Sequence, residues 1–142
     1  MFDYTYQGDP RLLPTSILAY IGDGVYELYT RLHMIDHDRG KVKGIHQKTI
    51  SLVNAKSQAA AARRLLDSLT EEELLVFKRG RNAHSRSMAK NADPVDYQVA
   101  TGFETLIGYL YLTRNESRLM ELFKKISDEP DETACENNKE NK

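Results

Sequence analysis

Two acidic residues interrupt segments that otherwise repeat apolar side chains at helical spacing. Asp23 follows Ile21 in one segment, and Glu104 follows Phe103 in the other. An ionised carboxylate loses solvation energy when it is buried, so such residues are usually paired, hydrogen-bonded or bound to a cation. The pattern leaves three interpretations open: a shared metal site, a buried salt bridge, or a capping role at a helix end.

A metal site would also explain the glycines near both acids. Glycine lowers helix stability, so its presence inside a helix indicates a close approach of another helix or of a ligand. The glycines concerned are Gly22, Gly24, Gly102 and Gly108. If the two segments cross, Asp23 and Glu104 could share Mg²⁺, which takes one or two carboxylates and completes its octahedral shell with water. One of these waters is the candidate nucleophile.

Glu27 lies one helical turn beyond Asp23, on the same helix face. It could be a further metal ligand, it could support the site through hydrogen bonds, or it could pair with Arg31 one turn further on. The histidines lack the spacing of a histidine-based nuclease, and we assign them no catalytic role. They are His33, His37, His46 and His84.

The formal net charge of −1 is unevenly distributed along the chain. Residues 128–142 hold six acids and two lysines, which leaves +3 on the rest. Within that remainder, residues 39–66 contain seven Lys or Arg and no acid, and residues 74–92 contain five and no acid. Such windows either give the protein a positive face that binds phosphates, or merely solvate helix surfaces.

Five helices would position these residues. They are expected over residues 14–34, 45–66, 70–77, 94–111 and 116–126. The third begins with the spacing of a capping box, Thr70 followed by Glu73. Residues 36–44 and 79–93 show little apolar periodicity and are predicted to connect helices, and no strand pattern competes. Residues 128–142 are too polar to pack and are predicted to be disordered.

A chain of 142 residues is long enough to form one domain with a single hydrophobic core. Its one cysteine, Cys135, lies in the polar tail, so no disulfide framework is expected. The first residues lack a basic region followed by an apolar run, and no apolar stretch approaches the roughly 20 residues that span a bilayer. We therefore expect a cytoplasmic protein with no membrane contact.

Three segments resemble, in order and spacing, motifs of the ribonuclease III family. Residues 18–26 are similar to the family signature Leu-Glu-Phe-Leu-Gly-Asp-Ala-Val, and residues 101–111 are similar to Asp-x-Phe-Glu-Ala-Leu-Ile-Gly-Ala-x-Tyr. Between them, residues 51–59 resemble the Leu-Val-Asn or Leu-Val-Ser helix of the family. The likeness spans about residues 14–127, and the three motifs in order are far more specific than any one alone.

Two positions depart from that family pattern. The family usually has a Glu four residues before the signature Asp and an Asp three residues before the second Glu, where this chain has Ala19 and Thr101. The reduced set of acids, together with Arg79-Gly-Arg-Asn-Ala83, resembles the Mini-ribonuclease III branch. The departures disfavour binding of more than one protein-held ion.

The resemblance implies an all-α, ribonuclease III-like endonuclease domain over residues 1–127, which pairs as a homodimer and is followed by the acidic tail 128–142. It implies that Asp23 and Glu104 are the catalytic residues and the Mg²⁺ ligands. The expected reaction is hydrolysis of double-stranded RNA to 5′-phosphate and 3′-hydroxyl ends. Its expected role is maturation of the large-subunit (23S) ribosomal RNA precursor.

The second basic window would then form an RNA clamp, because its residue types contact phosphates and 2′-hydroxyls in a shallow minor groove. The expected RNA-binding residues are Lys78, Arg79, Arg81, Asn82, His84, Ser85, Arg86 and Lys90. The simpler alternative is a solvated connector between helices.

Two other functions compete with this one. A catalytically inactive double-stranded-RNA-binding scaffold of the same fold would explain the absent acids, although it has no reason to keep Asp23 and Glu104 in apolar stripes. A regulatory helical bundle with protein partners would show neither RNA affinity nor stabilisation by Mg²⁺.

Overall fold

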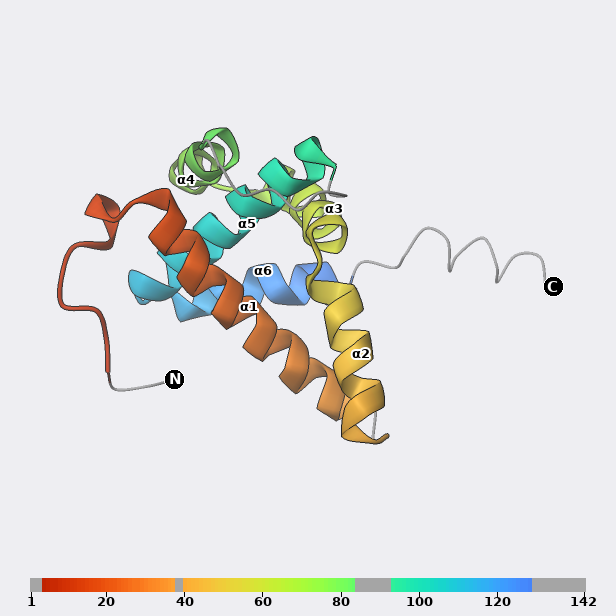
Figure 1. Cartoon of the computed structure of the whole chain (residues 1–142). Helices are drawn as coiled ribbons and strands as arrows, with labels where there is room; N and C mark the ends of the chain where they lie inside the picture. Colours follow the sequence, from red (N-terminus) through yellow and green to blue (C-terminus); the bar gives the residue numbers. More distant parts are fainter. Residues whose placement is uncertain (1–3, 38–39, 84–92, 129–142) are drawn as a thin grey trace.

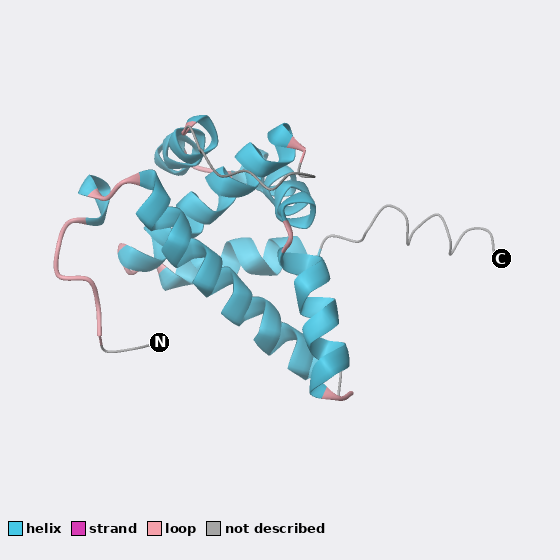
Figure 2. Ribbon diagram, in the orientation of Figure 1, coloured by secondary structure: helices cyan, strands magenta, loops and turns pink. Residues whose placement is uncertain are grey.

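Helices make up the framework of the protein in the computed structural model, which describes residues 4–37, 40–83 and 93–128. The helices are α1 (Thr15–His37), α2 (Val42–Val53), α3 (Ala55–Leu65), α4 (Glu71–Asn82), α5 (Pro94–Leu112) and α6 (Glu116–Asp128), with short 3₁₀ turns at Pro10–Leu12 and Leu66–Ser68. The described residues contain no strand (Figure 2), so the predicted all-α fold class is confirmed.

Helix α5 lies at the centre of the domain, with α1, α3 and α4 packed against it (Figure 1). Most of its residues from Val99 to Leu110 are buried. A helix enclosed on several sides needs apolar or small residues around most of its circumference, and this stretch of α5 meets that requirement. The largest fully buried apolar side chains of the core are Leu18, Leu65, Phe77, Phe103, Leu106 and Ile107.

Helices α1 and α5 cross at very short range because a glycine on each faces the backbone of the other. A Cβ atom on Gly22 would overlap the carbonyl oxygen of Glu104, and a Cβ atom on Gly108 would overlap the carbonyl oxygen of Leu18. These two glycines therefore have the role expected from the sequence. Gly24 differs from them, since a Cβ atom there would meet nothing within 4 Å.

The helix predicted over residues 45–66 is divided at Asn54, so the prediction of one continuous helix was wrong. Asn54 has extended backbone angles (φ −72°, ψ 163°), and its Oδ1 accepts a hydrogen bond of 2.9 Å from the amide of Ser57. Its Nδ2 donates to the carbonyl of Ser51 at 2.7 Å. The side chain thus ends α2 and caps α3, which is a favoured role of asparagine.

The predicted capping box at the start of α4 is confirmed. The Thr70 hydroxyl accepts from the amide of Glu73 at 3.1 Å, and the Glu73 carboxylate accepts from the amide of Thr70 at 2.9 Å. The end of this helix differs from the prediction, because residues 79–82 are helical and do not belong to a connector. Gly80 explains their packing: a Cβ atom there would overlap the side chain of Thr105 on α5.

The predicted connector between α4 and α5 and the acidic tail lie, from residue 84 to 92 and from residue 129 onward, outside the described residues. Among the described helices, none is both long enough and apolar enough to cross a membrane.

Candidate active site

The crossing of α1 and α5 brings the two acids of the sequence analysis together. Asp23 directly follows Gly22, which packs against the backbone of Glu104, so both carboxyls belong to the same crossing. Asp23 is exposed, whereas Glu104 is half-buried. The charge of Asp23 reaches Glu104 strongly enough to affect its pKa. Two residues that lie 81 positions apart in the sequence therefore form one acidic site.

Burial raises the pKa of Glu104 from 4.5 to about 7, and the negative charge of Asp23 adds to the rise. Burial also raises the pKa of Asp23, with a smaller contribution from the charge of Glu27. The shift at Glu104 means that the protein disfavours the ionised form of this carboxyl beside the charge of Asp23. A cation placed between the carboxylates would remove that penalty, because it stabilises the ionised form of each.

The two other interpretations of these acids do not fit the described residues. Within residues 4–37, 40–83 and 93–128, no Lys, Arg or His is paired with Asp23 or Glu104. Both acids also lie in the interior of long helices, far from the ends that a capping residue would serve. A buried salt bridge and a capping role are therefore not supported.

Glu27 forms the ion pair that the sequence offered as one of its interpretations. Arg31 Nη2 donates to Glu27 Oε1 at 2.7 Å, one turn along α1. The charge of Glu27 still reaches Asp23, where it raises the pKa of that carboxyl. Glu27 thus lies near the site with its carboxylate held by Arg31.

The positions where the family pattern has further acids carry side chains that cannot bind a metal ion well. Ala19 is buried on α1, and the Thr101 hydroxyl donates to the carbonyl of Tyr97 at 2.9 Å. No group of three or more His, Cys, Asp or Glu residues able to hold a metal ion occurs in the described part of the chain. Two carboxylates are nevertheless a donor set that fits Mg²⁺, because this ion keeps several of its waters.

A residue that the sequence analysis missed also belongs to this site. Gln58 on α3 is buried, and its side-chain amide lowers the pKa of Glu104, against the effect of burial. A signal was present in the sequence, since Gln58 interrupts the small apolar residues that bury the inner face of α3. This is the same pattern that drew attention to Asp23 and Glu104.

The described members of the expected RNA clamp lie on the last turns of α4. Lys78, Arg79 and Asn82 are exposed. Arg81 is half-buried, with its guanidinium carbon 6.0 Å from the centre of the Phe77 ring and its Nε donating to Asn82 Oδ1 at 3.2 Å. The other expected members lie outside the described residues: His84, Ser85, Arg86 and Lys90.

The fold defines an all-helical domain with an acidic site at the α1–α5 crossing, and comparison with known proteins identifies its family. The model of the ribonuclease III domain matches residues 16–115. The chain therefore belongs to the ribonuclease III family of endoribonucleases.

Within that family the chain is similar to proteins named Mini-ribonuclease 3. The protein from Clostridium tetani is 46% identical over 87% of this chain and 82% of its own length, and that from Enterococcus faecalis is 48% identical over 74% and 81%. A crystal structure of a protein from Fusobacterium nucleatum has the same fold, with a TM-score of 0.75 over 83% of this chain and 94% of that one, at 24% identity. The predicted Mini-ribonuclease III branch is confirmed.

Proposed function

We propose that the protein is a Mg²⁺-dependent endonuclease for double-stranded RNA, in which Asp23 and Glu104 together hold the ion. One observation supports this most strongly: two carboxylates from distant parts of the chain meet at the α1–α5 crossing, and no described cationic side chain neutralises them. Burial of Glu104 beside Asp23 is unfavourable for the empty protein. It becomes favourable when a divalent cation is bound.

When bound there, Mg²⁺ would lower the pKa of a coordinated water and neutralise charge on the phosphoryl oxygens. Asp23 and Glu104 would hold and orient the ion, and no histidine of the chain is given a part in the reaction. Attack of water on phosphorus in line with the leaving 3′ oxygen breaks the P–O3′ bond. The products are a 5′-phosphate and, once the leaving oxygen takes a proton, a 3′-hydroxyl.

The end of α4 is the proposed RNA-binding surface. Its exposed Lys78 and Arg79 offer positive charge, and Arg81 and Asn82 offer hydrogen-bond donors, on a helix packed against α5. Contacts of this kind position a duplex through its phosphates and sugars. We extend the surface, as the sequence predicts, to His84, Ser85, Arg86 and Lys90.

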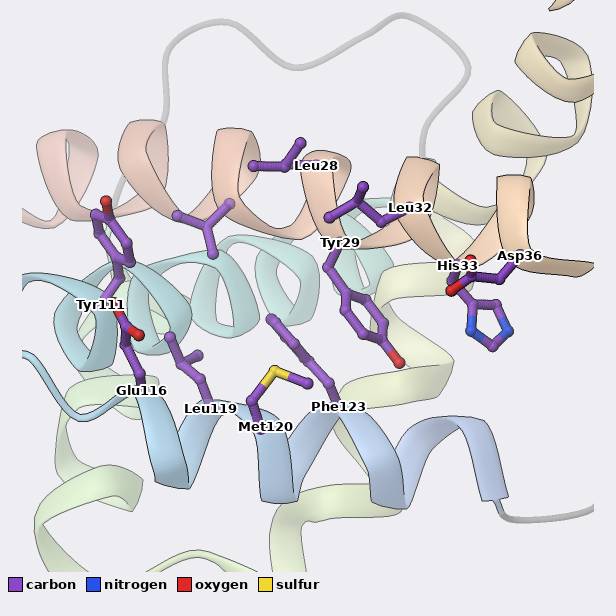
Figure 3. A pocket seen from close by; sticks show the side chains of 11 residues that line it. Leu28, Tyr29, Leu32, His33, Asp36, Tyr111, Glu116, Leu119, Met120 and Phe123 are labelled. Atoms are coloured by element: carbon purple, nitrogen blue, oxygen red, sulfur yellow. The ribbon is translucent and has the colours of Figure 1, made fainter. Parts of the chain in front are cut away.

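A homodimer would place one site on each strand of the duplex, and an apolar groove between α1 and α6 is the surface we propose for its formation. The groove has a volume of about 280 Å³ (Figure 3). Tyr29 of α1 and Phe123 of α6 stack across it with ring centres 4.4 Å apart. Leu32 and Met120, which also line it, are exposed in the single chain. Covering such side chains is a common source of dimer stability.

The dimer can be tested by sedimentation. The wild type is expected to sediment as a dimer at micromolar concentration, and Leu32→Glu and Met120→Glu are expected to sediment as monomers, because each places a charge in the covered groove. A wild type that sediments as a monomer would contradict the proposed dimer.

We further propose that the substrate is the precursor of large-subunit (23S) ribosomal RNA in the cytoplasm. The support is the resemblance to the Mini-ribonuclease III branch, and the sequence features that favour an intracellular protein. RNA from cells that lack the protein is expected to accumulate this precursor with unprocessed ends.

Cleavage of an end-labelled RNA duplex tests the proposed reaction. The wild type is expected to cut with Mg²⁺ and not with EDTA, and Asp23→Asn and Glu104→Gln are expected to lose cutting while they keep the fold. One observation favours an inactive RNA-binding scaffold, namely the replacement of two family acids by Ala19 and Thr101. Duplex binding by the wild type without any Mg²⁺-dependent cut would favour that scaffold.

A further inference from the structure

Gln58 is a buried amide in the wall of the acidic site. Its side chain is 1% exposed, and among the described residues its Nε2 atom has no partner in hydrogen-bonding geometry. The residues that share its face of α3 are apolar: Ala59, Ala61, Ala62 and Leu65. An unpaired amide at such a position destabilises the fold relative to an apolar side chain of similar size.

The structure fixes the backbone that carries this amide. Gln58 lies in the first turns of α3, and its own amide N–H donates to the carbonyl of Asn54 at 3.0 Å. Asn54 caps the helix by accepting from Ser57 at 2.9 Å. The break between α2 and α3 thereby fixes the position of Gln58. Helix α3 then packs along α5, the helix that carries Glu104.

The Gln58 amide lies close to the Glu104 carboxyl, because the helix that carries it, α3, packs along α5. An amide N–H group is a donor, and an ionised carboxylate is the strongest acceptor that the described site offers it. Hydrogen bonds of an active site are often poorly aligned in the empty protein and become short only in the complex. A buried Gln58 Nε2 that has no partner among the described residues fits this behaviour.

We propose that Gln58 is a positioning residue, whose Nε2 donates to the Glu104 carboxylate and holds it in the orientation that shares a cation with Asp23. This inference rests on the proposed Mg²⁺ site. Side chains that hydrogen-bond metal ligands in this way restrict their rotation and raise metal affinity. The need for such a residue is greater here because the site contains few acids, with Ala19 and Thr101 in place of two of them.

Metal binding without RNA distinguishes this role from a purely structural one. We would titrate Mg²⁺ into the full chain and follow the melting temperature for the wild type, Gln58→Leu and Gln58→Met. The two variants keep the approximate volume of the side chain and remove the amide. Thr49→Val is the matched control, because Thr49 is also 1% exposed and polar but donates to the carbonyl of Ile45 within its own helix.

The concentration of Mg²⁺ that gives half of the thermal shift is expected to rise about tenfold in both Gln58 variants and to stay unchanged in Thr49→Val. Without metal, Gln58→Leu is expected to melt at or above the wild-type temperature, because it removes an unpaired buried amide. Cleavage at subsaturating Mg²⁺ should fall and should recover at high Mg²⁺.

The experiment distinguishes failure of the Gln58 role from failure of the Mg²⁺ site. A wild type that Mg²⁺ stabilises, with unchanged half-saturation in both Gln58 variants, would overturn the role of Gln58 and leave the metal site standing. A wild type that does not respond to Mg²⁺ would overturn the metal site and, with it, the role of Gln58. If Gln58→Leu does not fold, Gln58→Met provides the same test, because its flexible side chain adapts to the available space.

Discussion

Gly22 on α1 packs directly against the backbone carbonyl of Glu104 on α5. This packing decides where Asp23 lies, because Asp23 is the next residue on α1. No side chain separates the two helices at the crossing, so the carboxyl that follows the glycine comes within electrostatic reach of Glu104. A helix–helix crossing that would otherwise serve packing alone therefore also assembles the acidic site.

Gly22→Ala is expected to destabilise the protein by about 2 kcal/mol or more and to abolish cleavage, because the new methyl group would push α1 and α5 apart. The control is Gly24→Ala, two residues along the same helix, where a Cβ atom would meet nothing within 4 Å. That variant should be neutral or stabilised by about 0.5–1 kcal/mol. Urea unfolding measures both. Equal effects of the two substitutions would contradict a tight crossing at Gly22.

The pH dependence of stability should reveal the raised pKa of Glu104 in the metal-free protein. Between pH 4.5 and about 7 the folded protein keeps a proton on Glu104 that the unfolded chain has released. The free energy of unfolding therefore falls as the pH rises through this window and levels off above it. Glu104→Gln removes this loss, so in EDTA its stability relative to wild type should increase from pH 4.5 to pH 8 by about 3 kcal/mol.

Urea unfolding at several pH values checks this expectation. Glu121→Gln is a suitable control, since Glu121 is an exposed acid on α6 whose side chain is 67% accessible. Parallel pH profiles for the wild type and Glu104→Gln would show that the carboxyl is not perturbed by its burial.

The proposed RNA surface on α4 predicts a change in salt dependence. Replacing Arg79 and Arg81 by Gln should weaken duplex binding and reduce the slope of log affinity against log salt by about one for each phosphate that the protein no longer neutralises. Arg11→Gln provides a control, because Arg11 pairs with Asp9 in the N-terminal segment. A double variant that binds the duplex as tightly as the wild type at every salt concentration would exclude Arg79 and Arg81 from the RNA interface.

An ion pair between α4 and α6, in which Glu73 is buried and Arg118 is half-buried, should contribute to stability and not to catalysis. Arg118 donates through two nitrogens to Glu73, which is 5% exposed, and through one of them also to the carbonyl of Ser68 at 2.7 Å. Glu73→Ala leaves Arg118 without this partner and breaks the capping box, so a loss of about 3–5 kcal/mol is expected. Glu121→Ala, which breaks only the exposed pair with Arg118, should cost less than about 1 kcal/mol.

Urea unfolding measures both losses, and cleavage per folded molecule should remain close to the wild-type value in both variants. Selective loss of cleavage by folded Glu73→Ala would show that α4 and α6 affect the site directly.

The helical pattern of the sequence predicted most of the fold because apolar periodicity reports burial. It failed at Asn54, where a helix-compatible run of residues continues on both sides and only the side-chain cap shows the break. It also failed over residues 79–82, where the buried position is Gly80. A glycine that lies against Thr105 contributes to packing without contributing to an apolar pattern.

The candidate site was predictable where a charge interrupts an apolar stripe, as Asp23 and Glu104 do. That the two meet required knowledge of the α1–α5 crossing, which the glycines and the family resemblance indicated in the sequence. Gln58 interrupts the apolar face of α3 in the same way. An uncharged amide costs less to bury than a carboxylate, so its presence there is a weaker sequence signal of a functional site. Its significance follows only from its place beside Glu104 in three dimensions.

Asp23 and Glu104 are proposed to share one divalent cation, and direct measurement of metal binding tests whether they do. Mn²⁺, which can replace Mg²⁺ at oxygen ligands and gives an electron paramagnetic resonance signal, would be titrated into the wild type, Asp23→Asn and Glu104→Gln without RNA. We predict one Mn²⁺ displaced by Mg²⁺ per wild-type chain, and loss of this site in each variant. Retention of the same site in either variant would contradict a cation shared by the two carboxylates.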